Sequence, residues 1–268
     1  MKQAKGKKFG MVIDLDKCTG CGTCMVACMS ENNVPFRQDN TDKLLSISWM
    51  QVYRLTNGKP FPDTEECYLP RPCQHCEGHH GHSPCVSVCP ATATDYDLDT
   101  GIVSQIYTRC FGCRYCMGAC PYHVRQFNWW DPVWPDGMEK SLNPNVSVRM
   151  RGIVEKCSFC FHRYQLAKEK AYIEGRREPA EDEYQTACTQ ACPAGAIIFG
   201  DLNNPHHAVH KIARPDNSHG GKPKNPKAFR LLERLGVNTK VYYMSSRKWV
   251  RRAGDNYTKN EDMEKKRA

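Results

Sequence analysis

The chain has 268 residues, a formal charge of +9, 40% hydrophobic residues and 17 cysteines. Its longest apolar runs have no more than six residues, whereas a transmembrane helix needs ~20. The first residues, MKQAKGKKFG, are basic but contain no apolar stretch, cleavage site or twin arginine. The sequence therefore predicts no transmembrane segment and no signal peptide of its own, and the odd number of cysteines argues against a small disulfide scaffold.

The cysteines fall into four blocks along the chain, and each block ends in C-x3-C. Proline follows the last cysteine in the second, third and fourth blocks, where the first block has Met29. Cys67 lies outside the blocks, and we expect it to be a buried apolar side chain. The blocks comprise Cys18, Cys21, Cys24 and Cys28; Cys73, Cys76, Cys85 and Cys89; Cys110, Cys113, Cys116 and Cys120; and Cys157, Cys160, Cys188 and Cys192.

Short strands and helices are expected between the blocks. Residues 32–65 form an insertion whose stretch SISWMQVYRL, residues 46–55, has the composition of a strand. A hairpin is expected in ATDYDLDTGIVSQIY, a linker at 131–151, a helix at 163–174, and a strand with a turn in AGAIIFGDLNN. Residues 204–268 are basic, polar and free of cysteine, which predicts an extended tail that is ordered by a partner.

The cysteine spacing is typical of iron–sulfur clusters. Three thiolates in C-x2-C-x2-C bind three irons of one cubane, and a fourth cysteine followed by proline binds the other cluster of a pair. Blocks one and three fit this bacterial ferredoxin pattern. Zinc sites more often combine two C-x2-C pairs, or cysteine with histidine, around one ion, so zinc is an alternative for blocks two and four alone. We predict four clusters of the 4Fe-4S type, with a 3Fe-4S cluster as an alternative at one of the four sites.

The basic charge has two interpretations. By itself, +9 suggests a nucleic acid or an anionic membrane surface as a partner. Each oxidised cubane with four thiolates contributes about −2, however, so four clusters would reduce the formal charge to about +1. The basic residues are then counter-charge for cofactors, and the rival is a zinc-stabilised nucleic-acid binder.

No catalytic residue is predicted. Every block supplies four thiolates, so no iron is left open to a substrate, and the chain contains no dinucleotide fingerprint and no nucleophile elbow. This pattern favours electron transfer without chemistry at the clusters.

The order and spacing of the blocks resemble the four-cluster iron–sulfur subunit of membrane oxidoreductases of the polysulfide reductase and DMSO reductase type. The motifs CTGCGTCMVACMSENNVP, CFGCRYCMGACPYHVR and KCSFCFHR with CTQACPAGAIIFGDL carry this resemblance over residues 9–203. The second block, with HCEGHHGHSPC, most resembles the iron–sulfur subunit of the menaquinone reductase (Qrc) complexes of sulfate-respiring bacteria, and its counterpart in alternative complex III.

The resemblance implies an α+β fold with two bacterial-ferredoxin-like modules and crossed cluster ligation. One module comprises residues 9–31 and 152–203, and the other comprises residues 66–130. The implied ligand sets are Cys18, Cys21, Cys24 with Cys192; Cys157, Cys160, Cys188 with Cys28; Cys73, Cys76, Cys85 with Cys120; and Cys110, Cys113, Cys116 with Cys89.

The resemblance also implies a role and partners. The subunit would carry electrons between a periplasmic redox subunit, of molybdopterin oxidoreductase or multihaem cytochrome c type, and a quinone site in an integral membrane subunit, near the cluster of Cys110. Menaquinone reduction is implied by the Qrc-like features, and the opposite flow, from quinol to substrate, by polysulfide and DMSO reductases. The expected location is peripheral, on the periplasmic face of the inner membrane. Two departures are the long insertion in block four and the absence of the C-terminal membrane helix of formate dehydrogenase relatives.

Other side chains near the blocks have several interpretations. The histidines of block two are expected in an exposed loop that contacts a partner, with metal binding or proton relay as alternatives. The tryptophans after block three could shield a cluster, fill an interface or pack ordinarily. Two arginines could stabilise reduced clusters or form surface salt bridges, and Arg114 could tune the potential of the cluster in its loop. These groups are His75, His79, His80 and His82; Trp129, Trp130 and Trp134; and Arg125 and Arg163.

Overall fold

The computed structural model describes residues 6–35, 47–79, 81–213, 215 and 222–255. Most of its elements are short, as the sequence predicted. In chain order they are β1 (Phe9–Asp14), α1 (Thr23–Glu31), β2 (Gln51–Thr56), β3 (Glu66–Arg71), α2 (Pro84–Ser87), β4 (Thr94–Tyr96), β5 (Val103–Gln105), η1 (Tyr107–Arg109), α3 (Tyr115–Gly118), β6 (Gln126–Phe127), η2 (Met138–Ser141), β7 (Val154–Glu155), α4 (Phe161–Ile173), α5 (Ala187–Gln190), β8 (Ile197–Asp201), α6 (Ala208–Ala213), β9 (Ala228–Phe229), η3 (Glu233–Leu235), β10 (Val241–Met244) and α7 (Lys248–Asp255).

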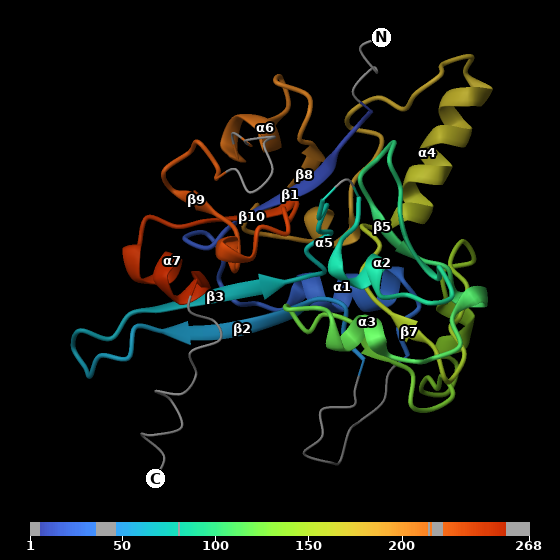
Figure 1. Cartoon of the computed structure of the whole chain (residues 1–268), viewed down its shortest axis with the longest axis horizontal. Helices are drawn as coiled ribbons and strands as arrows, with labels where there is room; N and C mark the ends of the chain where they lie inside the picture. Colours follow the sequence, from blue (N-terminus) through green and yellow to red (C-terminus); the bar gives the residue numbers. More distant parts are fainter. Residues whose placement is uncertain (1–5, 36–46, 80, 214, 216–221, 256–268) are drawn as a thin grey trace.

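A four-stranded sheet of order β8-β1-β10-β9 joins the two ends of the chain (Figure 1). β1 is antiparallel to β8, with Met11 opposite Phe199, and parallel to β10, with Met11 opposite Val241. Met11, Val12 and Ile13 have no exposed surface. β1 therefore reads as a continuous apolar run because both of its faces are buried.

The C-terminal segment corrects one prediction from the sequence. An extended tail was expected over 204–268, but its described residues form α6, β9, β10 and α7, and β10 lies beside β1 in the sheet. Phe229, Leu231, Tyr243 and Val250 are buried there. The prediction is wrong for these residues because their apolar side chains come in short groups that become a core only against β1. Residues 256–268 lie outside the described residues.

β2 and β3 form a hairpin that projects from the body of the molecule (Figure 1). Six residues pair on each strand, from Gln51 opposite Arg71 to Thr56 opposite Glu66. A strand was predicted for 46–55, of which 51–55 is confirmed and residue 46 is not described. Cys67, on β3, is 2% exposed, which confirms its buried role, and burial raises its pKa to about 11. The hairpin crosses the expected boundary at 65/66 between insertion and module.

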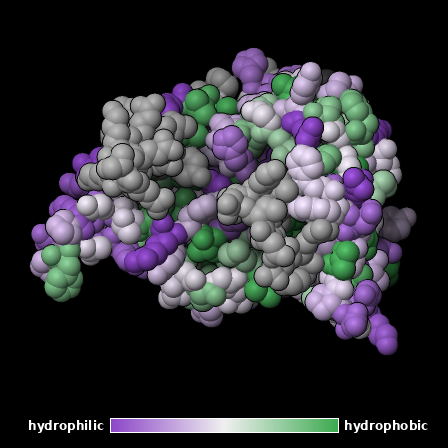
Figure 2. Space-filling model, turned by 90° about the horizontal axis from the view of Figure 1, so that it is seen from below, coloured by the Kyte–Doolittle hydropathy of each residue, from purple (hydrophilic) through white to green (hydrophobic). Residues whose placement is uncertain are grey.

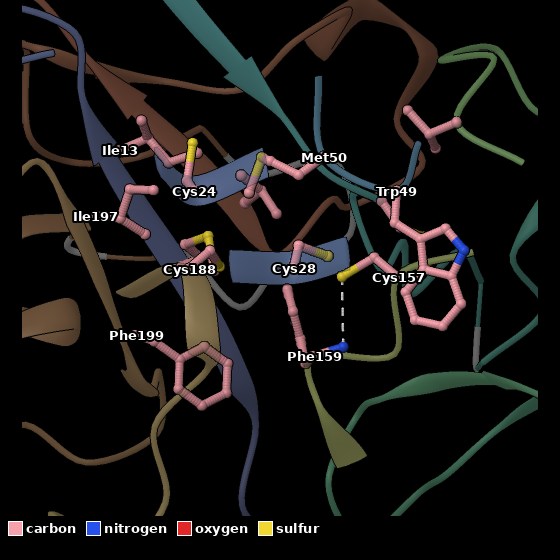
Figure 3. Packing of buried hydrophobic residues seen from close by; sticks show 14 of the residues in the cluster. Ile13, Cys24, Cys28, Trp49, Met50, Cys157, Phe159, Cys188, Ile197 and Phe199 are labelled. Carbon is pink, nitrogen blue, oxygen red and sulfur yellow. Dashed lines mark hydrogen bonds between the residues drawn. The ribbon is translucent and has the colours of Figure 1, made fainter. Parts of the chain in front are cut away.

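The predicted hairpin, helix and strand are confirmed within a few residues. β4 and β5 form the hairpin around Asp99-Thr100-Gly101, α4 is the helix inside block four, and β8 is the strand after it. The core lies between α1, the sheet and the cysteine loops, so cysteine sulfurs are packed among aliphatic and aromatic side chains (Figure 3). The thiols are therefore part of the core and not an addition to its surface.

The face seen from below mixes hydrophilic and hydrophobic residues in small patches (Figure 2). Exposed apolar side chains include Phe61 at the end of the β2–β3 hairpin, and Phe111 and Tyr115 in the third block. In the described part of the chain, none of the helices has the length and apolar character needed to cross a membrane.

Candidate metal centres

The first group of thiols combines three cysteines of block one with the last cysteine of block four. Burial, together with the nearby Cys18, Cys192 and Cys21, raises the pKa of Cys24 to about 11. The four cysteines line one hollow together with the loop glycines of block one and Pro193. Cys192 therefore lies with the thiols of block one and not with those of block four, its own block.

The second group is the reciprocal one. Cys28 is buried, and burial together with Cys157, Cys160 and Cys188 holds its pKa well above the usual range. The sulfurs of Cys28 and Cys157 point toward one another in Figure 3. Cys24 and Cys28 are therefore one helical turn apart on α1 but face different groups of thiols.

The other two groups cross in the same way. Burial holds the pKa of Cys76 far above its usual value, and Cys73, Cys85 and Cys120 add to this effect. These four thiols are the third group. In the fourth group, Cys89 lies with the thiols of block three. The hollow that they share is lined by Cys89, Cys110, Cys113 and Cys116, together with Arg114 and Val154 among others.

The four groups lie in a row. After burial, Cys73 is the largest cause of the raised pKa of Cys157, so the second and third groups are neighbours. Likewise, Cys24 of the first group raises the pKa of Cys188 in the second. Cys85 of the third group raises the pKa of Cys116 in the fourth. The order is therefore first group, second group, third group and fourth group.

Backbone amides donate hydrogen bonds to the sulfurs. Ala93 N lies 3.2 Å from Cys89 Sγ, and Ala196 N lies 3.3 Å from Cys192 Sγ, at equivalent positions after the two Cys-Pro turns. Although burial raises the pKa of Cys89, amide donors hold it below its usual value overall. Such bonds favour the thiolate, which is the form that binds iron, and they help to set cluster potentials.

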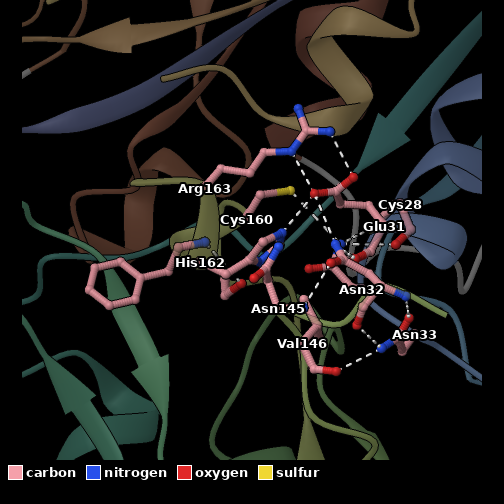
Figure 4. A network of polar contacts seen from close by, with 12 residues as sticks. Cys28, Glu31, Asn32, Asn33, Asn145, Val146, Cys160, His162 and Arg163 are labelled. Atoms are coloured by element: carbon pink, nitrogen blue, oxygen red, sulfur yellow. Dashed lines mark hydrogen bonds and ion pairs between the residues drawn. The ribbon is translucent and has the colours of Figure 1, made fainter. Parts of the chain in front are cut away.

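A polar network ties α1 to α4 beside the second group (Figure 4). Arg163 donates to both carboxylate oxygens of Glu31, at 2.6 and 2.7 Å, and His162 Nε2 lies 2.7 Å from the same carboxylate. Asn32 Nδ2 lies 3.7 Å from Cys28 Sγ and 3.8 Å from Cys160 Sγ. Of the two interpretations of Arg163, the structure therefore shows the salt bridge, and this salt bridge is partly buried.

Arg125 is different, because the interpretation of a surface salt bridge is wrong for it. It is 3% exposed and donates to two neutral oxygens, Thr94 Oγ1 and Gln105 Oε1, at 3.1 to 3.2 Å. Burial lowers its pKa, but the thiols around it, led by Cys85 and Cys116, raise it overall. The guanidinium thus lies between the third and fourth groups.

The donor set fits cubanes better than single ions. A zinc site needs its sulfurs within reach of one ion at about 2.3 Å. Within the described ranges, no group of three or more His, Cys, Asp or Glu side chains is close enough to hold such an ion. A cubane binds each thiolate through a different iron, so its four sulfurs lie further apart. The hollows lined by four thiols suit that arrangement.

The histidines and tryptophans have separate environments. His79 and His82 are exposed and pair through a short bridge, with His82 N 3.0 Å from His79 O, whereas His80 lies outside the described residues. His75 is fully buried, so the exposed-loop prediction is wrong for it. Trp129 packs edge-on against Phe127, and the Arg114 guanidinium lies 4.9 Å from its ring, while Trp134 lines an apolar pocket against α1.

Lys156 and Lys240 are buried cations that were not anticipated from the sequence. Lys156 Nζ donates to the carbonyls of Val103 and Cys157. Burial lowers the pKa of Lys240 to about 7, while Glu77 and two thiols of the third group raise it. The position of Lys156 directly before a block cysteine is the one local signal that could have indicated the first of them.

Four groups of cysteines with amide donors at their sulfurs define a multi-cluster iron–sulfur protein. The family described as "4Fe-4S dicluster domain" matches residues 64–135 and, in a second form, residues 109–196, and "4Fe-4S binding domain" matches residues 9–30. The chain carries 4Fe-4S clusters accordingly.

Curated relatives cover nearly the whole chain. It is 59% identical to the menaquinone reductase iron-sulfur cluster-binding subunit of Nitratidesulfovibrio vulgaris, over 95% of both chains. It is 37% identical to a putative dimethyl sulfoxide reductase iron-sulfur subunit of Halobacterium salinarum, over 88% of this chain and 79% of the relative. It is 38% identical to an Hdr-like menaquinol oxidoreductase iron-sulfur subunit of Archaeoglobus fulgidus, over 88% and 83%. The chain belongs to this family of iron–sulfur electron-transfer subunits of multisubunit reductases.

Proposed function

We propose that the chain is a four-cluster electron wire between a periplasmic redox subunit and a membrane quinone site. The row of four thiol groups carries this proposal, because each group brings four thiols together and each neighbours the next. A cluster accepts and gives up single electrons, and closely spaced clusters in a row form a path for them.

The four clusters would be held by crossed ligand sets in two ferredoxin-like modules. Blocks one and four form one module and blocks two and three form the other, with the last cysteine of each block exchanged inside its module. The protein supplies buried surroundings, amide donors and nearby cations, which exclude water and stabilise the thiolates. The proposed ligand sets are Cys18, Cys21, Cys24 with Cys192; Cys157, Cys160, Cys188 with Cys28; Cys73, Cys76, Cys85 with Cys120; and Cys110, Cys113, Cys116 with Cys89.

The proposed electron acceptor is menaquinone, which follows from the name of the relative with 59% identity over 95% of the chain. The partners would be a molybdopterin-oxidoreductase-like subunit or a multihaem cytochrome c at one end, and an integral membrane subunit at the other. The fourth group suits the membrane end, since Phe111 and Tyr115 beside its thiols are exposed and apolar. The chain would lie on the periplasmic face of the membrane, attached through these subunits.

The test compares the complete complex with the complex that lacks this chain. The complete complex should contain about 16 iron atoms and 16 acid-labile sulfides for this chain and should reduce a soluble menaquinone analogue. Without the chain, the donor subunit should still accept electrons from its own substrate, but the quinone should stay oxidised. Quinone reduction at an unchanged rate would refute the proposal, and a chain rich in zinc would refute the clusters.

A further inference from the structure

The residue before the second cysteine has a left-handed backbone in all four blocks. In the first and fourth groups, the outer groups of the row, this residue is glycine, Gly20 with φ 73° and Gly112 with φ 80°. In the second and third groups, the inner ones, it carries a ring: Phe159 with φ 55° and His75 with φ 44°. Glycine adopts this conformation freely, and rings do so at a cost. The two inner loops therefore hold side chains where the outer loops show that none is required.

The two rings meet at the boundary between the proposed modules. His75 and Phe159 stack with their centroids 3.7 Å apart and their planes at 16°, and neither has any exposed surface. His75 lies in the loop of the third group and Phe159 in the loop of the second. Cys73 and Cys157 begin these loops, two residues before His75 and Phe159 respectively. The stack thus spans the junction of the inner groups.

Both sides of the junction hold the stack in place. Val103 N donates to His75 Nδ1 at 3.1 Å. On the other side, Tyr184 Oη donates to the Phe159 carbonyl at 2.6 Å, and the Phe199 ring packs edge-on against Phe159 at 5.2 Å. The rings are therefore fixed in contact and close the junction to water.

We infer that the His75–Phe159 stack is the junction through which electrons pass between the two modules. The inference rests on the proposed four-cluster wire. Electron tunnelling decreases more steeply across empty space than across packed atoms, and the covalent route from the third group to the second runs through a long stretch of chain. In each transfer, one electron leaves a reduced cluster of one module and enters an oxidised cluster of the other. Neither ring is oxidised or reduced, so both act as positioning residues.

The experiment injects electrons into one module and times their arrival in the other. Val26, on α1 between two cysteines of the first module, is 68% exposed. A ruthenium photosensitiser attached to the Val26→Cys variant of the cluster-loaded chain, with a sacrificial reductant, reduces that module by a flash. Rapid-freeze EPR then follows the clusters of the second module.

Phe159→Leu and His75→Leu remove the stack but keep apolar volume, and we expect several-fold slower crossing in each. The double variant should be no slower than the slower single variant, because the rings act as one contact. Phe229→Leu is the matched control, since this buried ring packs against Tyr243 on β10 and is no part of the stack or its supports, and its crossing rate should be unchanged. Phe159→Gly and His75→Gly remove the rings at positions that suit glycine, so they provide folded variants if the leucine variants fail to fold.

The outcomes separate the inference from the proposed function. Unchanged crossing in the leucine and glycine variants, with all clusters present, would overturn the junction and leave the wire intact. Absence of crossing in the parent chain, or fewer than four clusters, would overturn the wire itself. Injection from the other side, through Tyr115→Cys on α3, should show the same slowing, and slowing in one direction alone would also overturn the junction.

Discussion

Replacing Asn32 by leucine should lower the reduction potential of one cluster, that of the second group. The side chain is buried, and its Nδ2 lies 3.7 Å from Cys28 Sγ and 3.8 Å from Cys160 Sγ. Hydrogen-bond donors stabilise the reduced cluster more than the oxidised one, because the reduced cluster is more negative. Removing them therefore lowers the potential.

The size of the shift follows from these distances. Both contacts are long, and the shorter bond from Nδ2 to the Cys28 carbonyl, at 2.9 Å, uses one of its two hydrogens, so the two sulfurs share the other. One weak hydrogen bond of about 0.5 kcal/mol favours the reduced cluster by about 20 mV for a one-electron couple. An EPR-monitored redox titration of the cluster-loaded chain measures this shift.

Asn33 provides the matched control, because it is equally buried and lies next to Asn32. Its Nδ2 donates to the carbonyls of Asn143 and Val146 at 2.8 and 2.7 Å, and no sulfur is among its hydrogen-bond partners in the described structure. Asn33→Leu leaves those carbonyls unsatisfied, so it should cost about 1–3 kcal/mol of stability without moving any potential. Equal shifts in both variants, or a shift spread over all four clusters, would refute the reasoning.

Further predictions concern the wire, the tail and cluster assembly. Arg125→Gln removes a buried cation between the third and fourth groups and should lower the potentials of those two clusters in the same titration; a shift in the first or second cluster would contradict its placement. Cys28→Ser should alter the EPR signal of the second cluster and leave that of the cluster in its own block, and the reverse result would contradict crossed ligation. Tyr243→Phe removes one accepted and one donated hydrogen bond and should lower the unfolding free energy by about 1–3 kcal/mol in chemical denaturation, whereas an unchanged value would contradict the packing of the tail. Cluster binding should strengthen as pH rises, because burial raises the pKa of thiols such as Cys24 to about 11 and these thiols must lose protons to bind iron; affinity that is independent of pH in reconstitution assays would contradict this.

The cysteine groups could be anticipated from the sequence because their geometry is largely local. C-x2-C loops and Cys-Pro turns bring sulfurs to a common centre through a few backbone angles and amide donors. The exchange of Cys28 and Cys192 between blocks came from a resemblance to known proteins and not from spacing. The structure places both residues beside the thiols of the other block.

The tail could not be anticipated because its partner strand is distant in sequence. β10 pairs with β1, and Tyr242 lies opposite Val12, more than two hundred residues away. A four-residue strand carries little local preference, so its place is decided by what it packs against. The burial of His75 could not be predicted for the same reason. The stretch CQHCEGHHGH has the composition of an exposed loop, and the ring is buried by Phe159, which is distant in sequence.

The buried cations explain part of the basic composition in physical terms. Arg125, Lys156 and Lys240 are buried in the described structure, and the first two donate to neutral oxygens. Uncompensated charges in such places are costly. Each lies near block thiols, to which oxidised clusters add negative charge, so cofactor and cations offset one another. The cluster-free chain should therefore be less stable for two reasons. Losing the clusters removes the iron–thiolate bonds that link the cysteine loops, and it leaves the buried cations without counter-charge.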